Sequence, residues 1–437
     1  MNIILLSGGS GKRLWPLSND VRSKQFIKVF KYGDQYESMV QRMYRQIKQA
    51  DPEANITIAT SKSQVSAIHN QIGYGVGISV EPDRRDTFPA IALATAYLHD
   101  IKGVGSDEAV VVCPVDPYVE DSYFECLKGL YETARRNENN LTLMGIEPTY
   151  PSEKYGYIIP ESDDGEHLYF SFKEKPDKHT AIEYIKQGAL WNGGVFAYKL
   201  SYVLNKANEL LGICGYDELL TSYSTLKKIS FDYAVVEHET SIDVLRYRGQ
   251  WRDLGTWNTL TTAMSENISG NAGMSENCEN VHILNELDIP IFAMGVKNLV
   301  IAAGPDGILV SDKDESSYIK PYVDRIDQQV MFAEKSWGSY HVLDVGEKSL
   351  IIKISIKPGD RMNYHSHERR DEVWTVVKGQ GRAIVDDMEQ VIKAGDVITM
   401  ASGCKHMVVA DTELEMVEIQ LGEDISVKDK HKYDIGL

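Results

Sequence analysis

Short apolar runs alternate with amphipathic stretches along the first part of the chain. The run MNIILL at residues 1–6 predicts a buried strand, and the apolar stripe at 37–50 predicts a helix with one buried face. The run NITIAT at 55–60 predicts a second strand. A further helix is predicted at 89–101, where a proline stands in the first turn, a position in which its missing N–H is tolerated. The chain therefore begins with strands and helices in alternation.

A third apolar run, EAVVVCPVD at residues 108–116, ends on an aspartate. Continuous apolar character is typical of a parallel strand covered on both faces, and the carboxyl end of such a strand faces the ligand crevice of an open α/β sheet. The alternation as a whole predicts an α/β fold over residues 1–265. We expect a Rossmann-like, doubly wound mixed sheet with helices on both faces.

The pattern changes after about residue 265. Short apolar pieces spaced by Gly, Asn and Asp predict a β-rich, β-helix-like connector with one or two solenoid turns over residues 266–325. Many short strand patterns follow over residues 326–437, with turn residues between them and no helical stripe. This part is typical of a compact all-β domain of the barrel or jelly-roll kind.

Composition and net charge limit the classes of partner that the chain is expected to bind. The chain has 437 residues, too many for one core, and a net charge of −18, which argues against nucleic acid or an anionic membrane as the main partner. The apolar run at the N-terminus is too short for a signal peptide, and no segment reaches the roughly 20 apolar residues of a membrane span. The five cysteines form no CxxC pair, which predicts reduced thiols. We therefore expect a cytoplasmic protein.

The stretch LLSGGSGKRLWPLSNDVRSKQF follows the first predicted strand and combines glycines with cations. The dinucleotide fingerprint fails here because Leu14 stands where the third glycine belongs, and the ATP-binding P-loop fails because Arg13 stands where Ser or Thr is needed. A tight turn with solvated basic residues is one interpretation. The other is a phosphate site of backbone amides and cations, made by Gly8, Gly9, Gly11, Lys12, Arg13 and Lys24.

Polar side chains recur at the ends of the predicted strands. Asp116 ends an apolar strand and Asp253 lies in WRDLGTW, and two strand-end carboxylates suit a Mg²⁺ that bridges phosphate oxygens. FKEKPD places Lys175 in a loop, and LWNGGVFAY offers Asn192 with two glycines just before a predicted strand, which suits a sugar pocket. Taken singly, these residues are also typical of helix caps, solvated turn lysines and tight turns.

In this order, the stretches resemble a known family, the sugar-1-phosphate nucleotidylyltransferases, and within it the bacterial mannose-1-phosphate guanylyltransferases with a C-terminal cupin domain. The resemblance covers nearly the whole chain. It rests on LSGGSGKRLWPLS, SKQF, EPDRRDTFPAIALA, CPVDPYV, GIEPTYPSEKYGYI, FKEKPD, LWNGGVFAY, SFDYAVVE and WRDLGTWNTL. It implies Mg²⁺-dependent attack of the sugar-phosphate oxygen on the α-phosphorus of GTP, giving GDP-mannose for polysaccharide biosynthesis and diphosphate, without a covalent nucleophile.

The resemblance also implies three sets of site residues within a nucleotidyltransferase domain at 1–265. The implied catalytic residues are Arg13, Lys24, Asp116 and Asp253, the two aspartates holding Mg²⁺. The implied nucleotide-binding residues are Leu6, Gly8, Gly9, Gly11, Lys12, Glu81, Arg84 and Asp116. The implied sugar-phosphate residues are Gly156, Glu174, Lys175 and Asn192. Two stretches near these sites depart from the family's pattern: RRDTFP stands where the family has GRNTAP, and Val115 and Pro117 flank Asp116. Guanine and mannose are therefore expected from the resemblance alone and not from these residues.

A second constellation lies near the C-terminus. PGDRMNYHSHERRDEVWTVVKGQG contains His365, His367 and Glu372, and His406 follows in GCKHMVV. Because side chains alternate along a strand, the HxH pair shares one face, and three histidines with a carboxylate suit Zn²⁺, Fe²⁺, Mn²⁺ or Ni²⁺. Two surface histidines on a strand edge are the alternative. The spacing also matches the cupin signature, so we expect a cupin of the mannose-6-phosphate isomerase type II kind at 326–437.

Several functions remain open from the residues. In many relatives the cupin isomerises mannose 6-phosphate, but this chain has the four-residue spacer ERRD where they have two residues, and it ends KHKYDIGL without their basic tail. The alternatives are the same transfer on another sugar, such as heptose 1-phosphate, or another base, a bifunctional enzyme, and a non-enzymatic sugar-nucleotide-binding regulator. We expect GTP and a sugar 1-phosphate as partners, a homodimer, and no nucleic acid or membrane partner.

Overall fold

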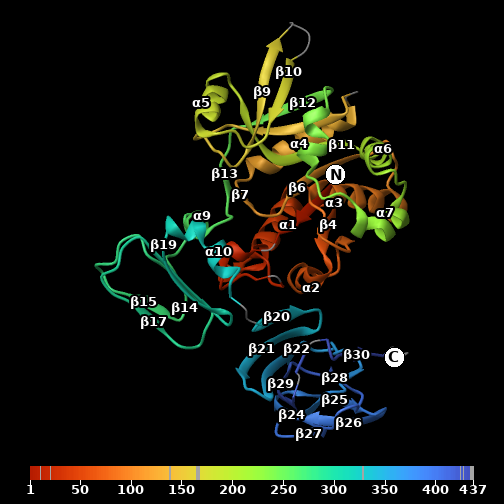
Figure 1. Cartoon of the computed structure of the whole chain (residues 1–437), viewed down its shortest axis with the longest axis vertical. Coiled ribbons are helices and arrows are strands. Elements are labelled where there is room, and N and C mark those ends of the chain that lie inside the picture. The colour runs from red at the N-terminus through yellow and green to blue at the C-terminus, as the bar shows by residue number, and fades with distance from the viewer. Residues whose placement is uncertain are drawn as a thin grey trace. The chain divides into compact units, whose positions relative to one another are not determined.

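The computed structural model in Figure 1 describes residues 1–9, 11–19, 21–136, 139–163, 168–326, 329–423, 425–426 and 428–433. The chain forms two compact units. The first comprises Met1–Ser10 and Ser23–Ser265, and the second comprises Gly11–Arg22 and Glu266–Leu437. The glycine-rich stretch is therefore divided: its first two glycines and its end from Ser23 onward belong to the first unit, and Gly11–Arg22 belongs to the second.

A nine-stranded mixed sheet forms the centre of the first unit, in the order β10-β9-β11-β6-β1-β4-β5, with β8 paired to β11 and β12 paired to β8. Its β1, β4, β5 and β6 run parallel, whereas β11 runs antiparallel to β6. The strands are β1 (Asn2–Ser7), β4 (Asn55–Ser61), β5 (Gly77–Glu81), β6 (Ala109–Pro114), β8 (Leu141–Ile146), β9 (Gly156–Asp163), β10 (Leu168–Lys173), β11 (Leu190–Lys199) and β12 (Ile242–Tyr247).

Helices cover both faces of this sheet. Ile3 and Leu5 pack in one apolar cluster with α1 and α4, while Ile4 between them packs with α3 in a second cluster, as the two-residue period of a strand requires. The predicted doubly wound architecture is thus confirmed. The helices are α1 (Met39–Ala50), α2 (Val65–Ile72), α3 (Thr87–Ala96), α4 (Ser122–Arg136), α5 (Lys178–Lys186), α6 (Leu200–Leu211), α7 (Tyr216–Ser222), α8 (Phe231–Ala234) and α9 (Trp257–Thr261).

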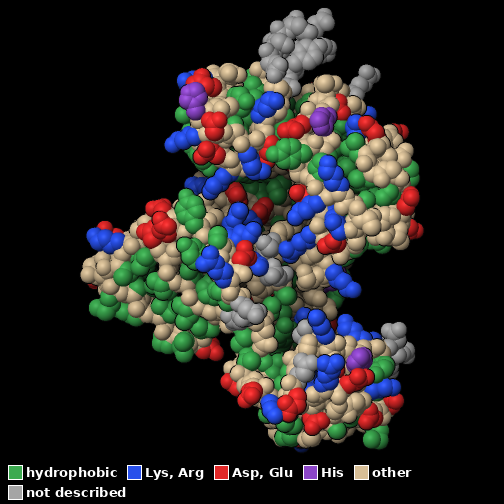
Figure 2. All heavy atoms as spheres, viewed as in Figure 1, with side chains coloured by type: hydrophobic (Ala, Val, Ile, Leu, Met, Phe, Trp, Pro, Cys, Tyr) green, Lys and Arg blue, Asp and Glu red, His purple; other side chains and the backbone are tan. Residues whose placement is uncertain are grey.

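Two short strand pairs complete the first unit. β2 (Phe30–Tyr32) pairs with β3 (Gln35–Glu37), and β7 (Pro117–Val119) pairs antiparallel with β13 (Trp251–Asp253). The second pair matters for function because it joins a strand just past β6 to a segment far along the chain. Figure 2 shows the surface of the first unit hollowed beside β7 and β13, with basic and acidic side chains around the hollow.

The second unit begins with a β-helical segment after residue 265. β14, β16 and β18 form one parallel ladder and β15 and β17 form another, as in successive turns of a solenoid, and β19 closes the first ladder antiparallel. The elements are β14 (Ile268–Gly270), β15 (Ala272–Met274), β16 (His282–Asn285), β17 (Ile291–Ala293), β18 (Leu299–Gly304), β19 (Gly307–Asp312) and α10 (Lys320–Val323).

An all-β domain follows in the same unit and confirms the predicted jelly roll. Its two antiparallel sheets have the strand orders β20-β21-β22-β29-β24-β27 and β26-β25-β28-β23-β30 and enclose the buried Trp374, Val408 and Met416. The strands are β20 (Phe332–Lys335), β21 (Gly338–Val345), β22 (Ser349–Ile356), β23 (His365–Ser366), β24 (Arg370–Lys378), β25 (Gln380–Val385), β26 (Met388–Lys393), β27 (Val397–Met400), β28 (His406–Ala410), β29 (Leu414–Gly422) and β30 (His431–Lys432).

Two expectations from composition can be compared with the structure. The five cysteines carry free thiols. Among the described residues, no helix is long and apolar enough to cross a membrane.

Candidate active site

A lysine and two aspartates from three distant stretches meet at the carboxyl edge of the sheet in the first unit. Asp116 follows β6, and Asp253 ends β13, where its register places it opposite Pro117 of β7. Lys24 Nζ lies 2.6 Å from Asp116 Oδ2 and 3.7 Å from Asp253 Oδ1. All three side chains are partly exposed, so a ligand can reach them. The structure thus brings together three of the four catalytic residues that the resemblance implied.

A buried hydrogen-bond network supports the glycine turn after β1. Gly9 has φ = 109°, a conformation that favours glycine, and its carbonyl accepts a hydrogen bond from Ser23 Oγ at 3.0 Å. Gln64 Nε2 donates to Ser23 Oγ at 2.6 Å, and Gln25 Nε2 donates to Ser7 Oγ at 3.1 Å. Because these side chains are buried and paired, the turn is held in one shape. Sequence analysis missed Gln64, an uncharged residue on the 3₁₀ turn Lys62–Gln64 after β4.

The middle of the glycine-rich stretch, Gly11–Arg22, is anchored within the second unit. Lys12 and Arg13 lie on a 3₁₀ turn, η1 (Lys12–Leu14), where the Arg13 side chain is exposed. Lys12 Nζ lies 3.1 Å from Asp324 Oδ1. Arg22 makes a two-pronged contact with Glu286, with nitrogen–oxygen distances of 2.6 and 2.8 Å. Acidic side chains of the β-helical segment therefore hold this stretch, a role that their own sequence does not suggest.

The predicted sugar-phosphate residues lie on β9 and β11 and in the loop just after β10. Gly156 pairs with Asn192 across β9 and β11. A Cβ at Gly156 would lie 2.5 Å from Glu174 Oε2 and 2.5 Å from the Phe172 ring, so any other residue there would force these side chains to move. Lys175 contacts Glu174 and adopts φ = 46°, a strained backbone conformation that is common in functional loops. One expectation is corrected: Asn192 and its two glycines lie within β11, at an irregularity in the β8–β11 pairing, not before the strand.

Asp232 lies beside these residues, although sequence analysis did not select it. Asn192 Nδ2 donates to Asp232 Oδ1 at 2.6 Å. Burial, with the nearby Glu174 carboxylate, raises the pKa of Asp232 from 3.8 to about 6. The signal was present in SFDYAVVE, but an aspartate at the start of a helix is more often a cap. This cluster of side chains therefore presents an amide, a lysine and two carboxyl groups, which suits recognition of a sugar with hydroxyls and a phosphate.

Asp232 makes the stability of the first unit pH-dependent. Its folded pKa lies above its ordinary value, so the folded state gains from the protonated form at low pH and loses that gain as pH rises from about 4 through about 6. We expect Asp232→Asn to become more stable relative to the wild type over that window, by on the order of 1–2 kcal/mol. Thermal midpoints measured at pH 4.5 to 7.5 check this. A difference between the two proteins that does not change with pH contradicts it.

Two of the remaining nucleotide-binding candidates lie on parallel strands of the sheet. Leu6 is near the end of β1, and Glu81 ends β5, which is separated from β1 by β4. Tyr223 donates a hydrogen bond to Glu81 Oε2 at 2.7 Å, and burial raises the pKa of Glu81. Arg84 is exposed in the following loop. Tyr223 is a further residue that sequence analysis missed, because it comes from a helical stretch about 140 residues away.

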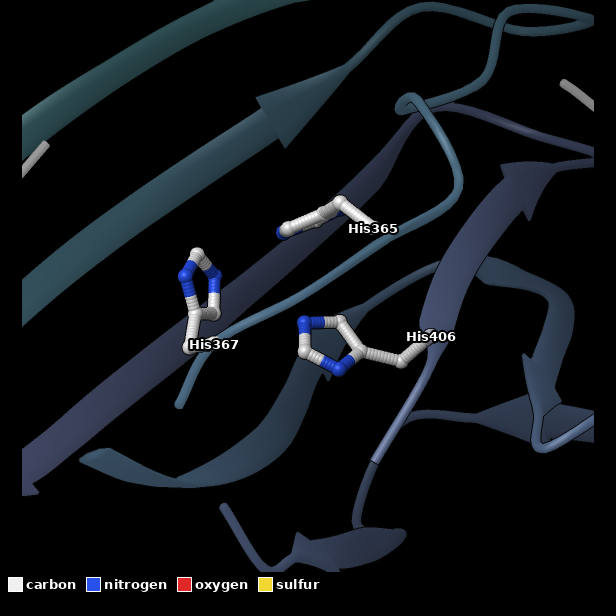
Figure 3. Close-up of side chains that lie close together, drawn as sticks. All are labelled: His365, His367 and His406. Carbon is white, nitrogen blue, oxygen red and sulfur yellow. The ribbon is translucent and has the colours of Figure 1, made fainter. Parts of the chain in front are cut away.

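Three buried histidines face one another inside the jelly roll (Figure 3). One ring nitrogen from each of His365, His367 and His406 lies within 4.8 Å of the others. Every Nδ1 is paired with a backbone carbonyl oxygen, which puts the ring proton on Nδ1 and leaves Nε2 as the nitrogen that could bind a metal. The acceptors are Asn363 at 2.6 Å for His365, Asp429 for His367, and Cys404 at 3.0 Å for His406.

Glu372 stands beside two of these rings. Its Oε1 lies 3.2 Å from His367 Nε2, and its Oε2 lies 3.2 Å from His406 Nε2. Among the described residues, Glu372 Oε2 and His406 Nε2 have no hydrogen-bond partner, although both are buried. Burial lowers the pKa of His365 to about 2 and that of His367 to about 4, so both rings are neutral at pH 7. Unpaired oxygen and nitrogen atoms around neutral imidazoles are a donor set that a divalent transition metal fits.

Sequence analysis missed three charged groups of this interior. Arg370 Nε donates to Glu372 Oε1 at 2.9 Å, and Arg370 Nη2 donates to His367 Nε2 at 2.8 Å. Burial raises the pKa of Glu418 to about 7 and lowers that of Lys430 to about 8. Arg370 was hidden in the charged spacer ERRD, which is otherwise typical of a solvated turn.

The chain combines a mixed α/β sheet, with two carboxylates and a lysine at its edge, and a jelly roll with a histidine cluster. These features define its class as a nucleotidyltransferase joined to a jelly-roll domain. Comparison with known families agrees. Residues 2–269 match the family model described as nucleotidyl transferase, and residues 324–434 match the one described as mannose-6-phosphate isomerase C-terminal. The chain belongs to the nucleotidyl transferase family and ends in a cupin domain.

Curated relatives share this arrangement over their full length. The xanthan biosynthesis protein XanB of Xanthomonas campestris is 28% identical, with 98% of both chains covered. The mannose-1-phosphate guanylyltransferase RfbM of Salmonella typhimurium is also 28% identical, with 96% of this chain and 95% of RfbM covered. A crystal structure described as mannose-1-phosphate geranyltransferase from Thermus thermophilus is 28% identical with a TM-score of 0.62, covering 75% of this chain and 99% of that one.

Proposed function

We propose that the chain is a Mg²⁺-dependent sugar-1-phosphate nucleotidylyltransferase that converts GTP and mannose 1-phosphate to GDP-mannose and diphosphate. The observation that carries the proposal is the meeting of Lys24, Asp116 and Asp253 at the carboxyl edge of the sheet. Relatives matched over their whole length, including RfbM, are named for this reaction. In the same unit, Gly156, Asn192, Glu174 and Lys175 are the residues we assign to the sugar phosphate.

The reaction needs charge neutralisation more than acid–base chemistry. A sugar-phosphate oxygen is already ionised at neutral pH, so it attacks the α-phosphorus without a base. The new oxygen–phosphorus bond forms as the bond to diphosphate breaks, and diphosphate leaves with the electron pair. Asp116 and Asp253 would hold Mg²⁺, which when bound neutralises charge on the phosphates. Lys24 lies between the two aspartates and supplies a further positive charge there.

Diphosphate release tests this function. The full chain is assayed with GTP, ATP, UTP and dTTP against mannose, glucose and heptose 1-phosphates. We expect the highest kcat/KM for GTP with mannose 1-phosphate. A higher kcat/KM for another pair would support nucleotidyl transfer as the reaction but identify that pair as the substrates. Absence of turnover with every pair would exclude the enzyme and favour a sugar-nucleotide-binding regulator.

Gly156 provides a local test of the sugar pocket. In Gly156→Ala the new methyl group would overlap Glu174 and Phe172, so both must shift. We expect KM for mannose 1-phosphate to rise by about tenfold while KM for GTP changes little, since a change of roughly 1–2 kcal/mol at one subsite has that effect. Steady-state kinetics with each substrate varied in turn measure this.

The matched control is Gly75→Ala, where a Cβ would meet no atom within 4 Å. It should leave both KM values unchanged. If Gly156→Ala raises the two KM values equally, the residue does not belong to a sugar-phosphate subsite.

We further propose that the cupin domain holds a divalent transition metal through His365, His367, His406 and Glu372 and isomerises mannose 6-phosphate. Two observations support it: the match of residues 324–434 to an isomerase C-terminal family, and the unpaired donor atoms of Glu372 and His406. Metal-loaded full-length protein incubated with mannose 6-phosphate should form fructose 6-phosphate. If it does not, the isomerase activity is excluded, and the proposed metal site is then tested by metal binding alone.

A further inference from the structure

The guanidinium of Arg370 lies against the histidine cluster, in contact with two of the residues that we propose as metal ligands. It bridges two of the four proposed ligands, donating from Nη2 to His367 Nε2 at 2.8 Å and from Nε to Glu372 Oε1 at 2.9 Å. The Arg370 side chain is 7% exposed and that of Glu372 is 2% exposed. This contact is therefore a buried ion pair inside the barrel.

The hydrogen-bond pattern shows which lone pair Arg370 uses. A guanidinium has only donors, so His367 Nε2 accepts, and its ring proton lies on Nδ1, which faces the Asp429 carbonyl. The accepting lone pair is the one with which His367 would bind a metal. Arg370 thus engages an imidazole nitrogen and a carboxylate oxygen that a metal ion would also need.

The backbone around Arg370 keeps the guanidinium in this place. Both carboxylate oxygens of Asp429 accept hydrogen bonds from the spacer, from the Glu368 and Arg369 backbone N–H groups at 3.0 Å each. Arg370 Nη1 also donates to the Ser426 carbonyl at 3.1 Å. The Arg370 guanidinium therefore has three hydrogen-bond acceptors, and Asp429 fixes the backbone next to it. This holds the side chain in one position, unlike a long side chain that rests on a surface.

We propose that Arg370 is an internal competitor of the metal ion in the cupin domain and so sets its metal affinity. In the arrangement described, His365, His406 and Glu372 Oε2 remain open to a metal, while His367 and Glu372 Oε1 are held by the guanidinium. Full ligation requires Arg370 to withdraw, and its positive charge opposes a divalent cation until it does. The inference rests on the proposed metal site of the cupin and is independent of nucleotidyl transfer in the first unit.

Zinc binding to the full chain tests this role. Purified wild type, Arg370→Met and the control Arg369→Met are stripped of metal, and their Kd for Zn²⁺ is measured by competition with a chromogenic chelator. Arg369 is exposed on the same spacer, so its variant makes the same change of charge outside the barrel. Zinc bound by a His406→Ala chain is subtracted as the background of other sites. The rise in thermal midpoint with Zn²⁺ gives a second readout.

We expect Arg370→Met to bind Zn²⁺ at least about tenfold more tightly than the wild type, because the substitution removes a positive charge that lies against two of the proposed ligands. Arg369→Met should match the wild type. Equal or weaker binding by Arg370→Met overturns the proposal and makes Arg370 a residue that orients Glu372. Absence of binding above background in both proteins overturns it as well. If Arg370→Met does not fold, Arg370→Gln, which keeps hydrogen-bond donors without the charge, is judged by the same criterion.

Discussion

Replacing Asp253 by asparagine should lower kcat for diphosphate release by about 10²–10³-fold, the cost of removing one electrostatic contributor from a preorganised site. Asp253 and Asp116 come from segments joined by the β7–β13 pair, and both lie beside Lys24. With one carboxylate gone, the remaining one holds Mg²⁺ poorly, and the α-phosphate loses neutralising charge. The measurement is kcat at saturating GTP, mannose 1-phosphate and Mg²⁺.

The double variant sharpens this prediction. Residues that act as one unit do not add, so Asp116→Asn with Asp253→Asn should be about as impaired as either single variant. Asp107→Asn, which changes an exposed aspartate in a loop of the same unit, is the control and should retain wild-type kcat. A kcat of Asp253→Asn within threefold of the wild type would remove the carboxylates from the mechanism and favour a binding protein.

The second large effect is expected at Lys175. Lys175→Ala should reduce kcat/KM for mannose 1-phosphate by about 10²-fold, the typical loss of a charge-assisted hydrogen bond of about 2–3 kcal/mol to a phosphate. The Lys175 side chain is 57% exposed beside Glu174, so its ammonium can turn to a ligand. Its backbone adopts φ = 46°, which carries some conformational cost. KM for GTP should change little.

Lys173→Ala is the matched control for this experiment. Lys173 is exposed at the end of β10, two residues away, and carries the same charge. It should keep the wild-type kcat/KM for both substrates. If Lys175→Ala weakens GTP as much as mannose 1-phosphate, the lysine acts on the nucleotide or on the general field of the site, and the sugar-phosphate assignment is wrong.

Local sequence patterns predicted the elements that carry these residues. The apolar run predicted at 108–116 contains β6, which ends at Pro114, and Asp116 follows two residues later, because a strand buried on both faces must be apolar until it reaches the sheet edge. The helix at 89–101 appears as α3 (Thr87–Ala96), continued by a π-helical turn over Tyr97–Ile101, and Asp86 accepts the capping hydrogen bond. These features depend on near neighbours in the chain, so the sequence contains them.

Groups that owe their role to distant partners escaped prediction. Asp232 looks like a helix-start aspartate until Asn192 and Glu174 are seen beside it. Arg370 looks like part of a solvated charge run until β24 carries it into the barrel against His367. Burial creates the chemistry in both cases, and the burial comes from strands that pair across tens of residues.

The sequence alone therefore determined the α/β and jelly-roll architectures, which follow from periodicity and residue type, and these are local properties. The motifs and their resemblance to a known family led us to predict Lys24, Asp116, Asp253 and the three cupin histidines as site residues. Only the tertiary structure decided that Lys24 lies between the two aspartates, that Gly11–Arg22 is held by the β-helical segment of its own unit, and that Arg370 engages the proposed metal ligands. Distances and desolvation depend on which distant segments pack together, and that information appears only when the chain is folded.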